Sequence, residues 1–420
     1  VNFVLGGTFS ASLVVLIIAV VAGVLVTGLM YINQMKLIEK IQQILFVRYT
    51  QEIANKLPVI DLKRSNDFYL PELTNRFFEI PALQKGLSKL LLEFPTASIQ
   101  ILFGLILLSF YHPAFILFGI LLVVILGTIL YYTGARGLST SIEESTQKYS
   151  LAAWLEEMAR GVKAFKFEPD GPVLTQNSEQ RTIRYLDKRT QHFRVLLFQY
   201  RILVFFKTTI TAAMLLVGSI LLLDQQLNIG QFIAAEIVIL IVIGAVEKLI
   251  GNLDSVYDVL TSVDKMAKLT EKPEELSGRL PMPWRKEGIT IELQQLRFGF
   301  HPEQKILEDV NGRIPSGGKA CITGPDGSGK STLLQLMGGI YTDFEGGLLY
   351  DGIPIANYQI DTLRAQIGIS LSGQHIFQGS VWENVTMGRT DITIEELMEW
   401  TVALRFDKQL QEWPLGWDTP

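Results

Sequence analysis

The stretch "GPDGSGKST", residues 324 to 332, decides how the second half of the chain folds. It fits the pattern G-x-x-x-x-G-K-[ST], in which the backbone curls so that several N–H groups point at phosphate oxygens beside a helix N-terminus. The preceding "KACIT" is typical of a strand, and the following "STLLQLMGGIY" is typical of a helix. Because the motif requires a strand, a loop and a helix in this order, we predict a phosphate-binding loop here.

The residues of this loop have separate predicted roles. Its glycines permit the tight backbone, Lys330 reaches the outer phosphates of a nucleotide, and Ser331 offers a hydroxyl to the accompanying Mg²⁺. A glycine loop that arose by chance is the alternative. The predicted nucleotide-binding residues in this stretch are Gly324, Pro325, Asp326, Gly327, Ser328, Gly329, Lys330, Ser331 and Thr332.

The composition of the whole chain points to lipid. Its 420 residues are 48% hydrophobic and 19% charged, with a mean hydropathy of +0.28, which is too apolar for an ordinary soluble enzyme. A net charge of −5 provides no basic excess for a phosphate backbone, so we predict no nucleic-acid partner. Cys321, the single cysteine, cannot form an internal disulfide and is expected to be a small buried strand residue. The four histidines are scattered without ligand-like spacing, so no metal site is assigned to the protein itself.

Apolar segments predict five membrane spans, since about 20 residues cross a hydrocarbon core. The uncharged stretch from 94 to 135 is long enough for two helices, which we expect to turn at 110–113, where Pro113 removes a backbone donor. Lys207, Glu236 and Glu247 lie within or beside the last two spans. We expect Lys207 to snorkel, Glu247 to lie at the membrane edge, and Glu236 to face a partner helix or a water-filled cavity. The predicted spans are 11–32, two within 94–135, 202–223 and 232–250.

Lysine and arginine crowd residues 36–93 and 136–201, which places both segments in the cytoplasm. Apolar residues recur there three and four positions apart, so we expect the membrane helices to continue about 40 Å beyond the bilayer. The alternative is that these segments are loops. Five spans would place Val1 outside, and we expect a further span before it, so that the sequence is a fragment cut at both ends.

A composition change marks a domain boundary. Residues 270–288 are rich in Pro, Glu, Lys and Gly, and short strand patterns begin at Ile289. The predicted organisation is a transmembrane domain over 1–265, a linker over 266–288 and a nucleotide-binding domain over 289–420. Asp351 and Gly352 are predicted to form a hairpin turn rather than to end a Walker B strand.

These features together resemble an ABC transporter subunit of the exporter type. The resemblance runs over almost the whole chain and includes "RFFEI" at 76–80, "LEEMARGVKAFKFE" at 155–168 and "GQFIAAEIVI" at 230–239. It implies an all-α polytopic transmembrane bundle with long cytoplasmic helical extensions, followed by an α/β P-loop NTPase domain. It also implies ATP and Mg²⁺ as cofactors and Phe300 as the residue that stacks on adenine, although Phe300 could instead be strand core.

The same resemblance implies partners and a location. One chain would be half of a machine, so a second half-transporter in a homodimer or heterodimer is expected, in a bilayer that is the plasma membrane or bacterial inner membrane. The transported substrate stays unknown. The expected activity is ATP-driven export by alternating access.

The sequence departs from the family pattern at "LSGQ", 371–374, which resembles the family's LSGGQ signature but stands where the Q-loop is expected. Aligned in this way, the family's glutamine position is occupied by Ser372, and Gln374 comes two residues later. The Walker B aspartate, the catalytic glutamate, the signature and the switch histidine are expected after Pro420, so no catalytic residue is assigned and the fragment is expected to be inactive alone. The alternatives are a regulatory subunit with a degenerate site, and a membrane-anchored P-loop kinase.

Overall fold

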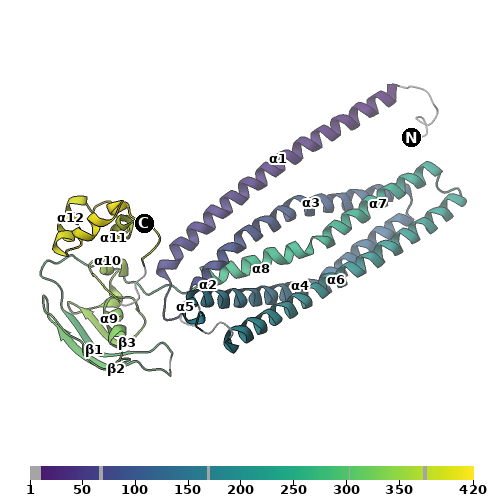
Figure 1. Cartoon of the computed structure of the whole chain (residues 1–420). Coiled ribbons are helices and arrows are strands. Elements are labelled where there is room, and N and C mark those ends of the chain that lie inside the picture. Colours follow the sequence, from purple (N-terminus) through teal and green to yellow (C-terminus); the bar gives the residue numbers. More distant parts are fainter. Residues whose placement is uncertain (1–10, 66–69, 168–170, 302, 372–375) are drawn as a thin grey trace. The chain divides into compact units, whose positions relative to one another are not determined.

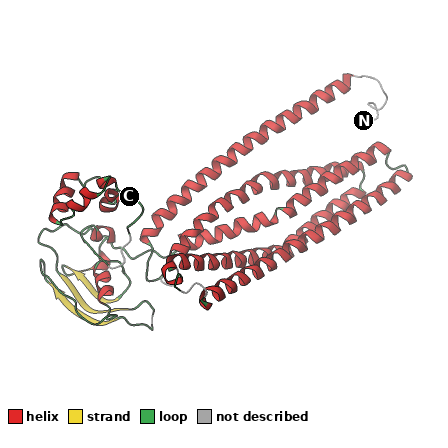
Figure 2. Cartoon of the chain, viewed as in Figure 1, coloured by secondary structure: helices red, strands yellow, loops and turns green. Residues whose placement is uncertain are grey.

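The structure is a computed structural model that describes residues 11–65, 70–167, 171–301, 303–371 and 376–420. The chain divides into two compact units, Val1–Glu275 and Leu276–Pro420. The division falls within the predicted linker. The first unit consists of helices, and the strands all belong to the second unit (Figure 2).

Long helices dominate the first unit (Figure 1). Five helical segments of the described residues are long and apolar enough to cross a membrane, which agrees with the five predicted spans. The charged segments 36–93 and 136–201 are helical over most of their described residues, so the loop alternative is wrong, and how far these helices reach beyond a bilayer stays a prediction. The helices of this unit are α1 (Ala11–Lys56), α2 (Leu70–Thr74), α3 (Glu79–Tyr111), α4 (Ala114–Arg160), α5 (Val162–Phe165), α6 (Pro172–Leu223), α7 (Ile229–Gly251) and α8 (Leu253–Thr270), with 3-10 turns at Leu57–Val59 and Asn75–Phe78.

The two short turns lie where the sequence predicts them. His112 is extended, and Pro113 caps α4, because a proline fits the start of a helix but not its interior. Asn228 and Gln231 form a reciprocal capping box that begins α7. The imidazole Nε2 of His112 lies 3.0 Å from Oε1 of Gln226, so the α3–α4 turn and the α6–α7 turn meet.

Helix α1 is packed differently from the others. Its most apolar window has no residue buried in the structure, whereas 33% of the corresponding window in α7–α8 is buried. Figure 1 shows its N-terminal half standing away from the remaining helices. Its C-terminal half contacts α3 through a reciprocal pair, in which the amide of Gln42 donates to the carbonyl of Gln84 and the amide of Gln84 donates to that of Gln42.

The core of this unit lies between α3, α4, α6, α7 and α8. Helices α3 and α7 approach closely because Gly104 has no side chain. A Cβ at Gly104 would lie 2.3 Å from Cγ2 of Val242, so any larger residue would force the Val242 side chain or the two helices to shift.

Two of the membrane charges form a pair that the sequence did not predict. Nζ of Lys207 is 2.9 Å from Oε2 of Glu247 in an ion pair between α6 and α7, which leaves the expectations for these two residues as predictions. Lys207 on α6 and Glu247 on α7 lie at the same level of two antiparallel helices. Their positions in the sequence did not predict this contact.

The second unit contains a four-stranded antiparallel sheet in the order β2-β1-β3-β4. Buried apolar side chains of β1, β3 and α9, among them Leu296, Leu348 and Leu336, form its core. The fold class agrees with the expected helical bundle followed by a P-loop domain. The elements are β1 (Ile291–Phe298), β2 (Leu307–Ile314), α9 (Lys330–Met337), β3 (Glu345–Tyr350), β4 (Ile353–Pro354), α10 (Ile360–Arg364), α11 (Val381–Thr386), α12 (Ile394–Ala403) and α13 (Asp407–Glu412).

Three local predictions have different outcomes. The Asp351–Gly352 hairpin is confirmed, since φ is 49° and 78° at these residues, as a type I′ turn requires. The strand predicted at 319–323 is wrong, because among the described residues no segment pairs with it, and Cys321 is exposed rather than buried. Helix α9 is shorter than predicted, because Gly338 caps it and Gly339 turns left-handed at φ 70°.

Candidate nucleotide-binding site

The predicted phosphate loop ends at the N-terminus of α9. Three of its glycines have φ values that L side chains rarely adopt, at 158° for Gly324, 79° for Gly327 and 85° for Gly329. Gly329 is also the residue that caps the helix. The backbone therefore curls as the motif predicts, because only glycine adopts such angles without strain.

Close packing adds a second reason for glycine at two of these positions. A Cβ at Gly324 would lie 2.8 Å from Oγ of Ser328, and a Cβ at Gly329 would lie 2.8 Å from Cδ2 of Leu307. At Gly327 nothing lies within 4 Å, so there only the backbone angle requires glycine. Glycine at these two positions therefore leaves room for the Ser328 hydroxyl and for the Leu307 side chain at the start of β2.

Lys330 folds back over the loop. Its Nζ donates to the carbonyl oxygens of Gly324, at 2.9 Å, and Pro325, at 2.7 Å. Asp326 is fully exposed, and its Oδ1 lies 3.9 Å from the same ammonium, so this ion pair is weak. The ammonium is therefore held at the centre of the curl by neutral acceptors, and an anionic phosphate oxygen would be a stronger acceptor for it.

The first turn of α9 has donors to spare. The N–H groups of Lys330, Ser331 and Thr332 make no hydrogen bond to an acceptor within the described residues, whereas Leu333 N–H donates to Gly329 O at 2.9 Å. The Ser331 side chain is exposed. Free N–H groups at a helix N-terminus attract anions, and a hydroxyl beside them is a Mg²⁺ ligand of the expected kind, so these residues fit a magnesium-bound phosphate.

Phe300 lies just after β1 in an aromatic cluster. Its ring is half-buried and packs edge-on against Phe298, at 5.2 Å between centroids, and against Tyr341, at 5.4 Å. Burial raises the pKa of the Tyr341 hydroxyl, which keeps it neutral. Both roles considered for Phe300 are compatible with this placement, because a ring that belongs partly to the core still exposes an edge or face. Tyr341 was not singled out in the sequence, since an aromatic residue after a helix gives no motif.

The structure brings the residues from Gly324 to Thr332 together in one loop. Ser372 and Gln374, the two candidates at the Q-loop position, lie outside the described residues. The segment that follows them begins α11, where Ser380 and Glu383 form a capping box. The assignment of site roles to Phe300 and to the loop stays a prediction.

A P-loop unit joined to five apolar helices defines the class as a membrane-embedded nucleotide-binding protein. The sequence pattern of the ABC transporter transmembrane region matches residues 1–246, and that of the ABC transporter matches residues 307–413. Because the first match alone covers more than half of the chain, the protein belongs to the ABC transporter family, as the resemblance implied.

Two relatives match this chain over different lengths. The chain is 36% identical over 152 residues to "Iron-sulfur clusters transporter ATM1, mitochondrial" of Saccharomyces cerevisiae, a match that covers 36% of this chain and 21% of that protein. It is 24% identical over 407 residues to "Uncharacterized ABC transporter ATP-binding protein YknV" of Bacillus subtilis, which covers 90% of this chain and 65% of that protein. The chain therefore matches between a fifth and two thirds of the length of these two relatives.

A solved structure shows the same fold. The structure titled "Structure of a bacterial Atm1-family ABC exporter with ATP bound" superposes with a TM-score of 0.81 and 18% identity, over 99% of this chain and 74% of that one. At this identity the likeness concerns the fold alone. The protein is a multi-pass membrane protein with an exporter-type fold and an ABC nucleotide-binding region.

Proposed function

We propose that this protein is one half of an ATP-driven exporter that works by alternating access. The observation that carries the proposal is that one chain joins a curled, donor-rich phosphate loop to five long helices that continue beyond their apolar parts. In such a chain, nucleotide binding would move the membrane helices, because a long helix transmits a displacement at one end to the other.

Lys330 and the N-terminus of α9 would hold the triphosphate of ATP, and Ser331 would hold its Mg²⁺. The cation supplies charge neutralisation to the phosphates when it is bound. The residues of this chain bind and orient: Lys330 exchanges its contacts with Gly324 O and Pro325 O for phosphate oxygens, and the free N–H groups complete the cradle. Phe300 would provide an aromatic surface for adenine.

The sequence holds a P-loop but no recognisable Walker B or signature motif after it. We therefore propose that these 420 residues bind nucleotide weakly and hydrolyse it negligibly by themselves, because the base and second carboxylate that phosphoryl transfer to water needs are not among the motifs present. We also propose that the chain dimerises with a second half-transporter, of the same or another kind.

The coupling would pass through residues near 68–80 and 155–168, of which 70–80 and 155–167 are described. Arg76 stacks on the ring of Tyr149, with its guanidinium carbon 3.7 Å from the centroid, and the Tyr149 hydroxyl donates to Oε1 of Glu79 at 2.6 Å. Asn75 also donates to Glu156. The start of α3 is thus bound to α4, and a push on either segment would move both helices.

We further propose the plasma membrane, or bacterial inner membrane, as the location. The Bacillus subtilis relative, which matches over 90% of this chain, comes from a bacterium, whereas the yeast relative has a mitochondrial name. Membrane fractionation of the native organism with an antibody against the chain tests this location directly.

The direct test of the function is Lys330→Ala in the purified full-length protein in lipid nanodiscs. We expect Mg·ATP affinity to fall at least tenfold and ATP-dependent transport to vanish, because the variant removes the only ammonium held in the loop. Lys319→Ala is the matched control, since this exposed lysine lies outside the loop. Undiminished transport by Lys330→Ala would contradict the proposal.

A further inference from the structure

Residues 271–282 carry the chain from α8 to the second unit, and hydrogen bonds hold most of this stretch. Its first residue ends α8, since Glu271 N–H donates to Ala267 O at 2.8 Å. The three residues from Pro273 to Glu275 pair with the segment that follows α1. The residues from Leu276 on are bonded to the second unit. The stretch therefore contains no long free segment.

The pairing at the end of α1 is a short antiparallel bridge. Asp61 N–H donates to Pro273 O at 3.0 Å, and Glu275 N–H donates to Val59 O at 2.9 Å. The two bonds run in opposite directions between the same two segments, so they fix both the distance and the direction of the chain there. We call residues 56–61 and 273–275 the linker clamp.

Side chains reinforce the linker clamp. Nζ of Lys56, the last residue of α1, lies 2.8 Å from Oε1 of Glu274, and the lysine side chain is only 12% exposed. Ile60 is 2% exposed and belongs to a buried apolar cluster with Leu73 of α2 and Leu269 of α8. Opening the linker clamp would expose Ile60 to water and separate the ion pair, so both contacts oppose opening.

The second unit holds the chain from the very next residue. Leu276 N–H donates to Oγ1 of Thr342 at 3.2 Å, and Gly278 N–H donates to Tyr358 O at 2.7 Å. Because Glu275 and Leu276 are adjacent, only the backbone torsions beside one peptide bond separate the two sets of contacts. A free linker absorbs a displacement at up to about 3.3 Å per residue, whereas this junction has no free residue.

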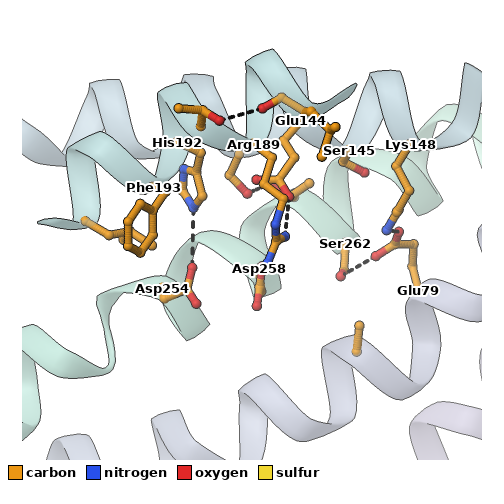
Figure 3. Close-up of a pocket in the computed structure, with 16 residues that line it drawn as sticks. Glu79, Glu144, Ser145, Lys148, Arg189, His192, Phe193, Asp254, Asp258 and Ser262 are labelled. Atoms are coloured by element: carbon orange, nitrogen blue, oxygen red, sulfur yellow. Dashed lines mark hydrogen bonds and ion pairs between the residues drawn. The ribbon is translucent and has the colours of Figure 1, made fainter. Parts of the chain in front are cut away.

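Helix α8 is held firmly by the rest of the bundle. It is bonded to α3 and α6 around a cavity of about 800 Å³ (Figure 3). Ser262 Oγ donates to Oε2 of Glu79 at 2.8 Å. Nε2 of His192 lies 3.3 Å from Oδ1 of Asp254. A displacement of α8 must therefore move α3 and α6 with it.

Helix α1 is held more loosely. Within the described residues it makes no hydrogen bond to another helix before Gln34, whose Nε2 donates to Leu91 O at 2.9 Å. Its next hydrogen bonds to α3 are those of the Gln42 and Gln84 pair. Because no residue of its most apolar window is buried, α1 can turn about these contacts when its C-terminal end is displaced.

The length of α1 sets the size of this turn. Lys56 lies 14 residues, about 21 Å, beyond Gln42. Ala11, the first residue of α1, lies 23 residues, about 34 Å, before Gln34. A rigid helix that turns about the contacts at Gln34 and Gln42 therefore moves farther at Ala11 than at Lys56, and in the opposite direction.

We infer that the linker clamp makes α1 a lever that the second unit moves. A movement of the second unit enters the first at Glu275, meets the firmly held α8, and turns α1 about Gln34 and Gln42. This route adds to the contacts near 68–80 and 155–168. The inference deepens the proposed function, and it rests on that function for the nucleotide-driven movement of the second unit.

Slack at the junction tests the lever. The sequence Gly-Ser-Gly-Ser is inserted between Glu275 and Leu276 of the full-length protein in nanodiscs, which adds up to about 13 Å of free chain. The same insertion between Pro283 and Trp284 is the matched control. Both of these residues are exposed, and they follow Met282, so the control leaves the junction and the bonded stretch intact.

Two nitroxide labels report the position of α1. They are attached at Val24→Cys on α1 and Leu102→Cys on α3 in a cysteine-free background, since both side chains are exposed. The two positions lie at similar levels, because Val24 comes 10 residues before Gln34 and Leu102 comes 11 residues after Leu91, which Gln34 contacts. Double electron–electron resonance measures the distance between the labels with and without Mg·ATP, with labelled chains diluted in unlabelled ones.

We expect Mg·ATP to change this distance by several ångströms in the unaltered protein and in the control insertion. The junction insertion should abolish the change and leave Mg·ATP affinity within twofold, because Lys330 is untouched. A full change in the junction insertion, or an equal loss in the control, would overturn this inference alone. No change in the unaltered protein would instead contradict the proposed function, and the lever with it.

A charge exchange tests the linker clamp without nucleotide. Lys56→Glu places two carboxylates together and should raise amide hydrogen exchange at Asp61 and Glu275 about fivefold, as the loss of one ion pair does. The double variant with Glu274→Lys restores opposite charges and should return exchange to within twofold of the unaltered protein. Lys40→Glu, at an exposed residue of α1 outside the linker clamp, is the matched control and should change nothing. Exchange that is equally fast in the single and double variants would overturn the role given to this pair.

Discussion

Single residues show most clearly what the motif in the loop predicts. The φ values at Gly324, Gly327 and Gly329 agree with the spacing of glycines in the motif, because other residues adopt such values only with strain. The contacts of Lys330 with Gly324 O and Pro325 O do not follow from the motif, which describes the lysine with phosphate present. The motif describes the lysine with phosphate bound. Without phosphate, the Lys330 ammonium donates to the nearby carbonyl oxygens.

The ion pair of Lys207 and Glu247 leads to a prediction at this scale. Lys207 lies about 24 Å along α6 from its end at Leu223, which is still within a hydrocarbon core of about 30 Å. Removing one partner, by Lys207→Met or Glu247→Gln, leaves an unpaired charge or a lone polar group at that depth. We expect each single variant to unfold at a lower temperature than the double variant, because the double variant leaves no unpaired charge.

Thermal unfolding of the four proteins in the same nanodiscs measures this effect. A variant of the exposed pair Lys188 and Glu143 provides the control, because those side chains interact at 2.7 Å in the charge-rich part of the bundle. Its single and double variants should differ little. Additive losses at Lys207 and Glu247 would show that the two side chains do not interact in the membrane.

At the scale of elements, hydropathy and charge predicted the helices well. The turn at His112 and Pro113 and the break between α6 and α7 follow from proline and polar residues, which interrupt a helix locally. The strand expected at 319–323 is wrong because strand formation depends on a partner, and no described segment pairs with it. A helix forms its hydrogen bonds within one segment, so local sequence can predict it, whereas a strand also needs a partner segment.

The packing of α3 against α7 gives a prediction for an element. Gly104→Ala places a Cβ 2.3 Å from Cγ2 of Val242, so the Val242 side chain or the helices must shift. We expect a loss of about 1–3 kcal/mol in the free energy of unfolding, as overpacking usually costs. Gly127→Ala on α4, where nothing lies within 4 Å, is the control and should not destabilise the protein.

A compensating change strengthens this test. Val242→Ala in the Gly104→Ala background removes the clashing methyl groups and should recover part of the loss. Thermal or denaturant unfolding of the purified protein in one detergent gives the comparison. Equal stability of Gly104→Ala and Gly127→Ala would contradict the close packing described for Gly104 and Val242.

At the scale of the whole molecule, the sequence could predict two kinds of domain but not the cavity between α3, α4, α6 and α8. Glu79, Ser145, His192 and Asp258 are far apart in the chain, and only Glu79 lies in a stretch that the resemblance singled out, "RFFEI" at 76–80. Their meeting depends on the rotation of each helix about its axis, which weak amphipathicity leaves undetermined. The nucleotide loop, by contrast, is one short stretch, so its composition alone reveals it.

The central claim is that nucleotide at Lys330 moves the membrane helices. The most direct measurement uses Leu215, which lines a groove along α6 that Glu247 of α7 borders and which lies about 12 Å before the end of α6 at Leu223. Leu215→Cys is introduced into a cysteine-free background, in which Cys321, the single cysteine of these 420 residues, and any cysteine elsewhere in the full-length protein are replaced by Ser. A membrane-impermeant maleimide is then applied from the side of the α6–α7 turn to the full-length protein in vesicles.

We predict that Mg·ATP increases labelling of Leu215→Cys at least severalfold, because the helices then open towards that side, and that the added Lys330→Ala change abolishes the increase. Labelling that is the same with and without Mg·ATP, or an increase that persists in the Lys330→Ala protein, would contradict the account.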